Sequence, residues 1–188
     1  FMLMASFTHP HNPFVTTKEF WDLYDHSKIL MPKVPWSPIS LRDPWSQRYA
    51  LTIREDEHDV SEKDLRNARH AYLGMVSYFD HLIGKLIKSL KECDFFENTY
   101  VFIVADHGEM LGDHGIYLKG PYFYDPAIRV PFMMRYPRKI TPGEKIGLTE
   151  LVDVVPTLLE ACDLEIHEGI QGQSLWNDLA INKQYTGR

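Results

Sequence analysis

Cysteine is scarce in this sequence, and the scarcity excludes two classes of protein. Only Cys93 and Cys162 are present among 188 residues, and neither belongs to a Cys-x-x-Cys pair. A disulfide-stabilised scaffold and a cysteine-rich zinc site both need more cysteines at closer spacing. We therefore expect two reduced thiols in the interior, although the sequence alone leaves a disulfide between them open.

Net positive charge is also lacking. The formal net charge is −6, and the longest basic cluster, at residues 135–139, is short. Because nucleic-acid binding needs a basic face, we predict no nucleic-acid partner and interpret the cluster as a solvated loop.

Long apolar runs are absent as well. None approaches the roughly 18 to 20 residues that span a bilayer, so we predict no membrane partner. Residues 1–7 are apolar but short, and no basic residue precedes them, which argues against a signal peptide. The segment is typical of a core strand, with which a mature chain rarely begins. We therefore expect the chain to continue upstream, which leaves its compartment open between the cytoplasm and the periplasm or exterior.

Alternating strands and helices predict an α/β fold. Ser61 and Asp64 resemble a capping box at the start of a helix whose apolar residues recur every three or four positions. We predict one partial domain over residues 1–188, with a largely parallel sheet flanked by helices. The strands are expected at 1–7, 99–105 and 130–135, and shorter helices at 16–24 and 151–161.

Polar side chains follow two of the predicted strands. His9 and His11 come after the first strand, and Asp106 and His107 directly follow the second. In an open α/β sheet, ligands bind beyond the carboxyl ends of the strands. A carboxylate after a buried strand is costly unless it is paired or bound to a metal. Taken alone, the pair Asp106–His107 indicates either a metal site or an aspartate at the start of a loop beside an unrelated histidine.

A longer string around this pair is more specific. Residues 105–115 read ADHGEMLGDHG, and KGP at 119–121 and RVPF at 129–132 follow in order. This string resembles the sulfatases of the alkaline phosphatase superfamily. Other segments agree with that family in order and spacing, namely THPHNPF at 8–14, YLGMVSYFD at 72–80, VDVVPTLL at 152–159 and GQSL at 172–175. The choline-sulfatase branch is the most similar, on the segments at 8–14 and 43–48.

The resemblance implies metal ligands at Asp106 and His107. Calcium is the cation expected most often in this family, and the imidazole of His107 keeps magnesium and manganese open. The resemblance also implies that Lys119 binds the sulfate group and takes part in catalysis. It implies that His11 binds the ester and protonates the leaving alcohol, a role suited to a histidine. His9 is a neighbouring candidate for substrate binding.

The nucleophile that the resemblance implies is missing from this sequence. Sulfatases use a formylglycine made from Cys or Ser in the motif Cys or Ser, x, Pro, x, Arg, and neither Cys93 nor Cys162 lies in such a motif. The resemblance places this motif and further metal ligands upstream of Phe1, and a C-terminal subdomain beyond the chain. We expect the parent protein to hydrolyse a small-molecule or saccharide sulfate ester. The remainder of the parent is then this chain's partner, and the chain alone is expected to be inactive.

Several alternatives stay open. Phosphonate monoester hydrolases and phosphodiesterases of the same superfamily share the DHGE string, and a non-catalytic metal-binding module would keep the same fold. The oligomeric state and the leaving alcohol are not indicated by the sequence. Choline is one candidate alcohol, because aromatic side chains in the loops could form a cation–π pocket, although such residues more often simply pack. These side chains are Trp36, Trp45, Tyr122 and Tyr124.

Overall fold

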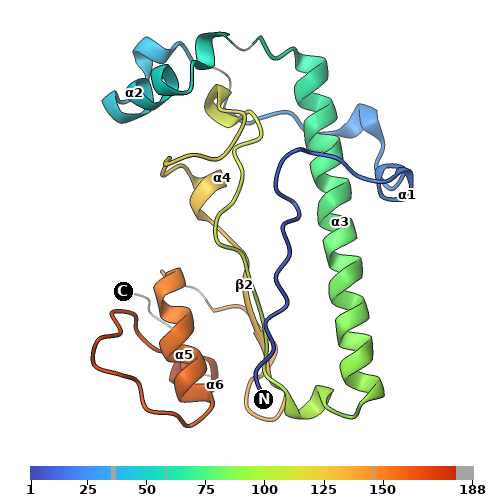
Figure 1. Ribbon diagram of the computed structural model, residues 1–188, viewed down its shortest axis with the longest axis vertical. Helices are drawn as coiled ribbons and strands as arrows, with labels where there is room; N and C mark the ends of the chain where they lie inside the picture. Colours follow the sequence, from blue (N-terminus) through green and yellow to red (C-terminus); the bar gives the residue numbers. More distant parts are fainter. Residues whose placement is uncertain (35–36, 58, 146, 181–188) are drawn as a thin grey trace. The chain divides into compact units, whose positions relative to one another are not determined.

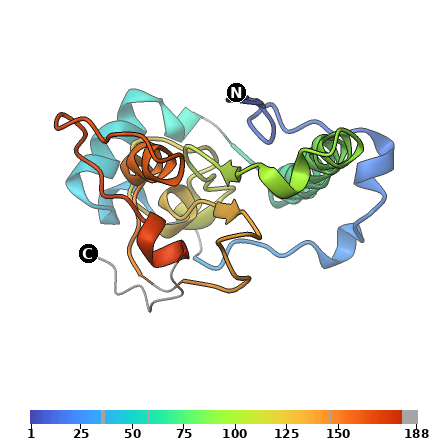
Figure 2. The same cartoon turned by 90° about the horizontal axis from the view of Figure 1, so that it is seen from below.

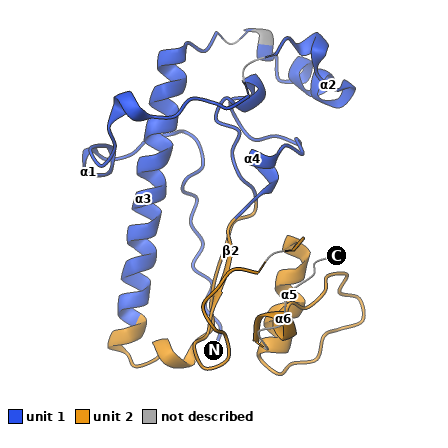
Figure 3. Ribbon diagram, turned by 180° about the vertical axis from the view of Figure 1, so that it is seen from behind, with its two compact units in different colours: residues 1–89, 107–130 blue, residues 90–106, 131–188 orange. Residues whose placement is uncertain are grey.

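The computed structural model describes residues 1–34, 37–57, 59–145 and 147–180. The chain divides into two compact units, which are coloured separately in Figure 3. Unit 1 comprises Phe1–Ser89 and His107–Val130, and unit 2 comprises Leu90–Asp106 and Pro131–Arg188. The expectation of one partial domain over residues 1–188 stays a prediction.

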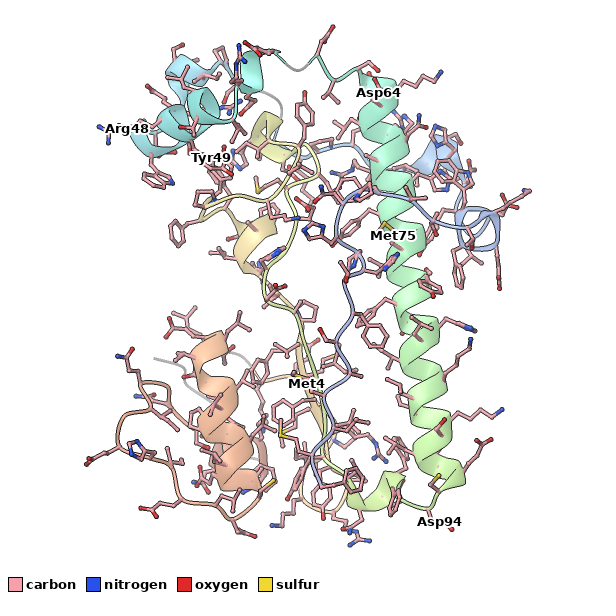
Figure 4. All side chains as sticks on the ribbon, viewed as in Figure 1. Met4, Arg48, Tyr49, Asp64, Met75 and Asp94 are labelled. Atoms are coloured by element: carbon pink, nitrogen blue, oxygen red, sulfur yellow. The ribbon has the colours of Figure 1, made fainter. Side chains whose placement is uncertain are left out.

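The predicted long helix is confirmed as α3 (Glu62–Glu92), which is prominent in Figure 1. Its capping box is also confirmed, because the Asp64 backbone N–H donates to Ser61 Oγ at 3.2 Å and the Ser61 N–H donates to the Asp64 carboxylate at 3.3 Å. In Figure 4, Asp64 marks the start of α3 and Met75 lies near its middle. Met75 is only 1% exposed, whereas Val76 and Leu86 are 39% and 38% exposed, so the apolar stripe is fully buried only around Met75.

The segment before α3 packs along the helix. Residues 7–20 contact α3, and the stretch around α1 (Lys18–Trp21) lies beside the helix in both Figure 1 and Figure 2. Three edge-on ring pairs hold them there, with centroids 5.2, 5.9 and 5.3 Å apart: Phe7–Phe79, Phe14–Tyr72 and Phe20–Tyr78. Gly74 permits the close approach, because a Cβ on it would lie 2.8 Å from Thr16 Cγ2.

The expected strand at residues 1–7 is not found. The structure assigns no strand there, and the side chains of residues 1–4 are 74–94% exposed. A strand needs a neighbouring backbone for its hydrogen bonds, and only β1 and β2 are paired in the described part of the chain. The segment packs through rings such as Phe7 instead.

The remaining helices of unit 1 are short. α1 (Lys18–Trp21) falls within the predicted range, whereas α2 (Pro44–Thr52) and α4 (Asp125–Ile128) lie in stretches that read as loops. Pro44 occupies the first turn of α2, where proline is tolerated, and the Asp43 carboxylate accepts the Trp45 and Ser46 N–H groups at 3.0 Å. Single turns of 3-10 helix in this unit span His26–Lys28, Ile39–Leu41, Glu55–Glu57 and Asp113–Gly115.

Unit 2 contains the two strands. β1 (Val101–Val104) and β2 (Phe132–Arg135) confirm two predicted strands but pair antiparallel, with Val101 opposite Arg135. The largely parallel sheet is therefore not confirmed. Parallel pairing requires a crossover that restores the strand direction, whereas the chain here returns reversed. Unit 2 also holds α5 (Val154–Ala161), α6 (Trp176–Ala180) and the 3-10 turns Phe96–Asn98 and Leu151–Asp153.

Buried hydrogen bonds connect the VDVVPTLL and GQSL segments. The fully buried Asp153 carboxylate accepts the Glu150 N–H at 2.9 Å and the Gln173 N–H at 2.8 Å. The equally buried Thr157 hydroxyl donates to the Asp153 carbonyl at 2.6 Å and accepts the Leu175 N–H at 2.9 Å. The two segments therefore brace the fold of unit 2.

The expectation that both thiols lie in the interior is wrong, because Cys93 and Cys162 are exposed. Both are free, as expected. No helix in the described part of the chain has the length and apolar character needed to cross a membrane.

We predict that Thr157→Val lowers the free energy of unfolding by about 1 to 3 kcal/mol, because the Leu175 N–H loses its buried acceptor. Thr52→Val is the matched control, since that exposed hydroxyl also donates to the carbonyl four residues earlier. Its effect should stay within about 0.5 kcal/mol. Urea denaturation of both variants measures the difference, and equal losses would contradict the bracing role.

Candidate active site

Close backbone contact with α4 fixes Gly108, at the start of the loop that begins with His107. The Gly108 N–H donates to the Ala127 carbonyl at 2.7 Å, and the Glu109 N–H donates to the Pro126 carbonyl at 3.0 Å. A Cβ on Gly108 would lie 2.0 Å from the Pro126 oxygen, so no other residue fits without moving the backbone. The backbone at Gly108 and Glu109 is thereby fixed against α4.

The His107 side chain is exposed, and its ring is oriented by the backbone of Gly108. His107 Nδ1 lies 2.8 Å from the Gly108 carbonyl oxygen, which can accept a hydrogen bond but cannot donate one. In the neutral ring this contact places the proton on Nδ1 and the lone pair on Nε2, the arrangement in which a histidine binds a metal.

Asp106 precedes this histidine but belongs to unit 2. Its side chain is exposed, and β1 before it is half-buried rather than fully buried. The argument that a buried carboxylate needs a compensating partner is therefore wrong for Asp106. The Asp106 carboxylate and the His107 imidazole are each accessible, and the two residues stay the predicted ligand pair.

Glu109 and Lys119 form the charged centre of the site in unit 1. Glu109 Oε2 lies 3.9 Å from Lys119 Nζ, and the two side chains are 4% and 20% exposed. Burial raises the pKa of the Glu109 carboxyl, while the nearby charges of Lys119 and His107 lower it. Glu109 and Lys119 are therefore close enough for their opposite charges to interact, with most of the Glu109 side chain shielded from water.

The loop at 8–14 meets Lys119 through Asn12. Lys119 Nζ donates to Asn12 Oδ1 at 2.7 Å, although the two residues are 107 positions apart. His11 Nδ1 lies 2.5 Å from the backbone oxygen of Asn12. The structure thus joins Lys119 to the loop that carries His11, and it does so through Asn12, to which the motifs gave no role.

His9 has a different environment from His11. Its ring lies edge-on to Tyr78 of α3, with centroids 5.5 Å apart. The contact anchors the loop to the helix and leaves the imidazole exposed. Substrate binding by His9 stays a prediction.

The aromatic side chains suggested for a cation–π pocket mainly pack. Tyr122 is 4% exposed and belongs to an apolar core with Met110 and Ile116. Trp45 is 54% exposed, and its indole N–H donates to the Pro121 carbonyl at 3.0 Å. The ring of Tyr124 stacks on His114 at 3.9 Å. Trp36 lies outside the described residues.

The Tyr122 hydroxyl is the buried side-chain polar atom without a hydrogen-bond partner in the described part of the chain. Burial raises the pKa of Tyr122 to about 12, so the hydroxyl stays neutral. The ion pair of Arg42 and Glu55 braces the chain on either side of α2, with nitrogen–oxygen distances of 2.8 and 2.6 Å. The ion pair therefore stabilises the fold around α2.

Metal ligands are incomplete in this part of the chain. Among the described residues, no group of three or more His, Cys, Asp and Glu side chains is placed to hold a metal ion. Asp106 and His107 offer one carboxylate and one imidazole, which are suitable donors for a divalent cation. These donors fit a share of a metal site and need further ligands from elsewhere.

Comparison with known proteins agrees with these motifs. A family model described as Sulfatase matches residues 1–164. A choline-sulfatase from Rhizobium meliloti is 38% identical over 166 residues, which are 88% of this chain and 32% of the relative. An arylsulfatase from Clostridium perfringens is 31% identical, over 100% of this chain and 39% of the relative. The chain thus spans about a third of the length of the curated relatives it matches.

A solved structure supports the same comparison at the level of the fold. The phosphonate monoester hydrolase from Silicibacter pomeroyi matches with a TM-score of 0.77 and 30% identity, over 91% of this chain and 35% of the hydrolase. The chain therefore shares its fold with part of that hydrolase.

We predict that Gly108→Ala destabilises the protein by about 3 kcal/mol or more, because the new methyl group overlaps the Pro126 carbonyl. Gly84→Ala is the matched control. It lies in α3 with nothing within 4 Å of the new Cβ, so it should stabilise by about 0.5 to 1 kcal/mol. Urea denaturation tests both variants, and a Gly108→Ala variant as stable as the wild type would contradict the close contact between Gly108 and α4.

Proposed function

Because the chain belongs to the sulfatase family, we propose that the full-length protein that carries it hydrolyses a sulfate ester. The observation that carries the proposal is the hydrogen bond from Lys119 to Asn12, which joins Lys119 to the loop that carries His11. Both residues lie within the matched range 1–164. A cation can bind an anionic ester, and an imidazole can protonate its leaving oxygen.

In this proposal, Lys119 binds the sulfate group and offsets negative charge on its oxygens or on the leaving oxygen. His11 contacts the ester and protonates the leaving alcohol through Nε2, because Nδ1 faces the Asn12 carbonyl. His9, two residues earlier in the same loop, is a further substrate-binding group. Glu109 limits the net charge beside Lys119 and holds the loop.

Asp106 and His107 are proposed as ligands of a divalent cation, with calcium first and magnesium or manganese as alternatives. A bound cation would supply polarisation of a sulfate oxygen. His107 contributes a ring orientation that its contact with Gly108 fixes. The further ligands, and the formylglycine nucleophile expected for the family, are proposed to lie outside this chain.

The architecture of the parent is part of the same proposal. Residues 1–188 would form one partial domain, and β1 would belong to a largely parallel α/β sheet completed by other segments of the parent. The chain's share of its relatives' length, 32% and 39%, is consistent with such a partial domain.

The substrate class is proposed as a small-molecule or saccharide sulfate ester. Choline sulfate is the first candidate, because the choline-sulfatase relative is 38% identical. Phosphonate monoester or phosphodiester hydrolysis is the second candidate function, favoured by the TM-score of 0.77 to a phosphonate monoester hydrolase. Comparing kcat/KM on choline sulfate, an aryl sulfate, a phosphonate monoester and a phosphodiester distinguishes these functions.

We predict that Lys119→Met in the full-length protein lowers kcat/KM for its sulfate ester by about 100- to 1,000-fold, because the transition state loses a cation. Lys18→Met is the control, since the Lys18 side chain is 86% exposed, and it should leave the rate unchanged. Sulfate release measures both variants. The isolated 188-residue chain should release none, and activity from it would refute the proposal that the nucleophile lies elsewhere.

We predict that calcium at a hundredfold excess over its Kd stabilises the full-length protein by about 2.7 kcal/mol. Replacing both proposed ligands, Asp106→Asn with His107→Ala, should abolish most of this gain, whereas Asp125→Asn should retain it because the Asp125 side chain is 75% exposed and pairs with Arg129. Thermal unfolding with and without calcium measures the gain. An unchanged response in the double variant would remove Asp106 and His107 from the metal site.

A further inference from the structure

We propose that Asn12 is a positioning residue, which holds Lys119 and His11 in the arrangement that binds and protonates the ester. The inference rests on the proposed function and deepens it. Asn12 contacts the two groups with different atoms, since its side-chain oxygen accepts from Lys119 at 2.7 Å and its backbone oxygen faces His11 Nδ1 at 2.5 Å. One residue therefore sets the positions of both.

The side-chain contact restricts a flexible cation. A lysine side chain has four carbons in its flexible stem, and its ammonium samples many positions unless acceptors hold it. Lys119 has two acceptors nearby, Asn12 Oδ1 at 2.7 Å and Glu109 Oε2 at 3.9 Å. Only the first is at hydrogen-bond distance, so Asn12 defines where the ammonium lies.

The chemistry of the amide also matters. A neutral amide oxygen accepts a hydrogen bond without cancelling the charge of the ammonium. Glu109 already supplies one carboxylate near Lys119. The neutral Asn12 oxygen therefore orients Lys119 and leaves its positive charge available to a sulfate oxygen.

The backbone contact orients the imidazole. A carbonyl oxygen can only accept, so His11 Nδ1 carries the proton in this contact. The Nε2 atom is then the position where the ring gains or loses a proton. Asn12 therefore sets both the position of the ammonium and the tautomer of the neutral histidine.

Two substitutions in the full-length protein separate these contributions. Asn12→Leu removes the side-chain acceptor but keeps a similar size and the backbone carbonyl, and it should lower kcat/KM by about 10- to 100-fold. Asn12→Asp keeps an acceptor oxygen but adds a second carboxylate that cancels the charge of Lys119, so it should also lower kcat/KM although Lys119 stays in place. Asn177→Leu is the control, because Asn177 donates only to Glu160 on an exposed surface.

A double variant tests whether Asn12 acts through Lys119. In the Lys119→Met background, Asn12→Leu should cause little further loss, because the interaction it removes is already absent. Additive losses in this cycle would overturn the inference. If Asn12→Leu does not fold, as judged by circular dichroism, Asn12→Ala takes its place in the same cycle.

A measurement without turnover separates this inference from the proposed function. Modification of Lys119 by an amine-reactive reagent, quantified by mass spectrometry, should become about fivefold faster in Asn12→Leu and stay near the wild-type rate in Asn12→Asp. An unchanged rate in Asn12→Leu overturns the inference. If the rate responds as expected but the wild type hydrolyses no sulfate ester, the proposed function fails while the positioning of Lys119 by Asn12 is supported.

Discussion

The hydrogen bond from Lys119 to Asn12 is the interaction on which the candidate site depends. It joins loops that are 107 positions apart in the sequence, at a distance of 2.7 Å. Without it, the Lys119 ammonium would lose its hydrogen bond to the loop at 8–14, which ring contacts hold on α3. The bond is effective because the Lys119 side chain is only 20% exposed, so water competes weakly for the ammonium.

The long helix α3 makes this meeting of loops reproducible. Ring contacts dock residues 7–20 on one stretch of the helix. Arg69 reaches from the same helix to the carbonyls of Leu30 and Leu111 at 2.5 and 2.7 Å. The helix thus fixes the loop that carries His11 and the loop that leads to Lys119. Loops placed on a rigid element in this way keep functional groups in register.

Local sequence patterns predicted the elements that depend on local physics. The capping residues Ser61 and Asp64 and the apolar stripe were sufficient for α3, and β-branched and aromatic residues were sufficient for β1. Strand pairing was not predictable, because its direction depends on the path of the chain between β1 and β2. Residues 1–7 show the same limit: their composition suits a core strand, but a strand also requires a paired neighbour.

For the candidate site, the sequence identified the charged and titratable groups but not the atoms between them. His11, His107 and Lys119 stand out because their residue types can carry chemistry. Asn12, in a loop with two prolines, reads as an ordinary turn residue, and its pairing with Lys119 involves a separation that no periodic pattern encodes. Glu109 likewise gains its importance from burial, which raises its pKa against the effect of Lys119. The described residues therefore connect Asn12, Lys119 and Glu109, whereas the proposed metal ligands Asp106 and His107 would need further donors from outside the described residues.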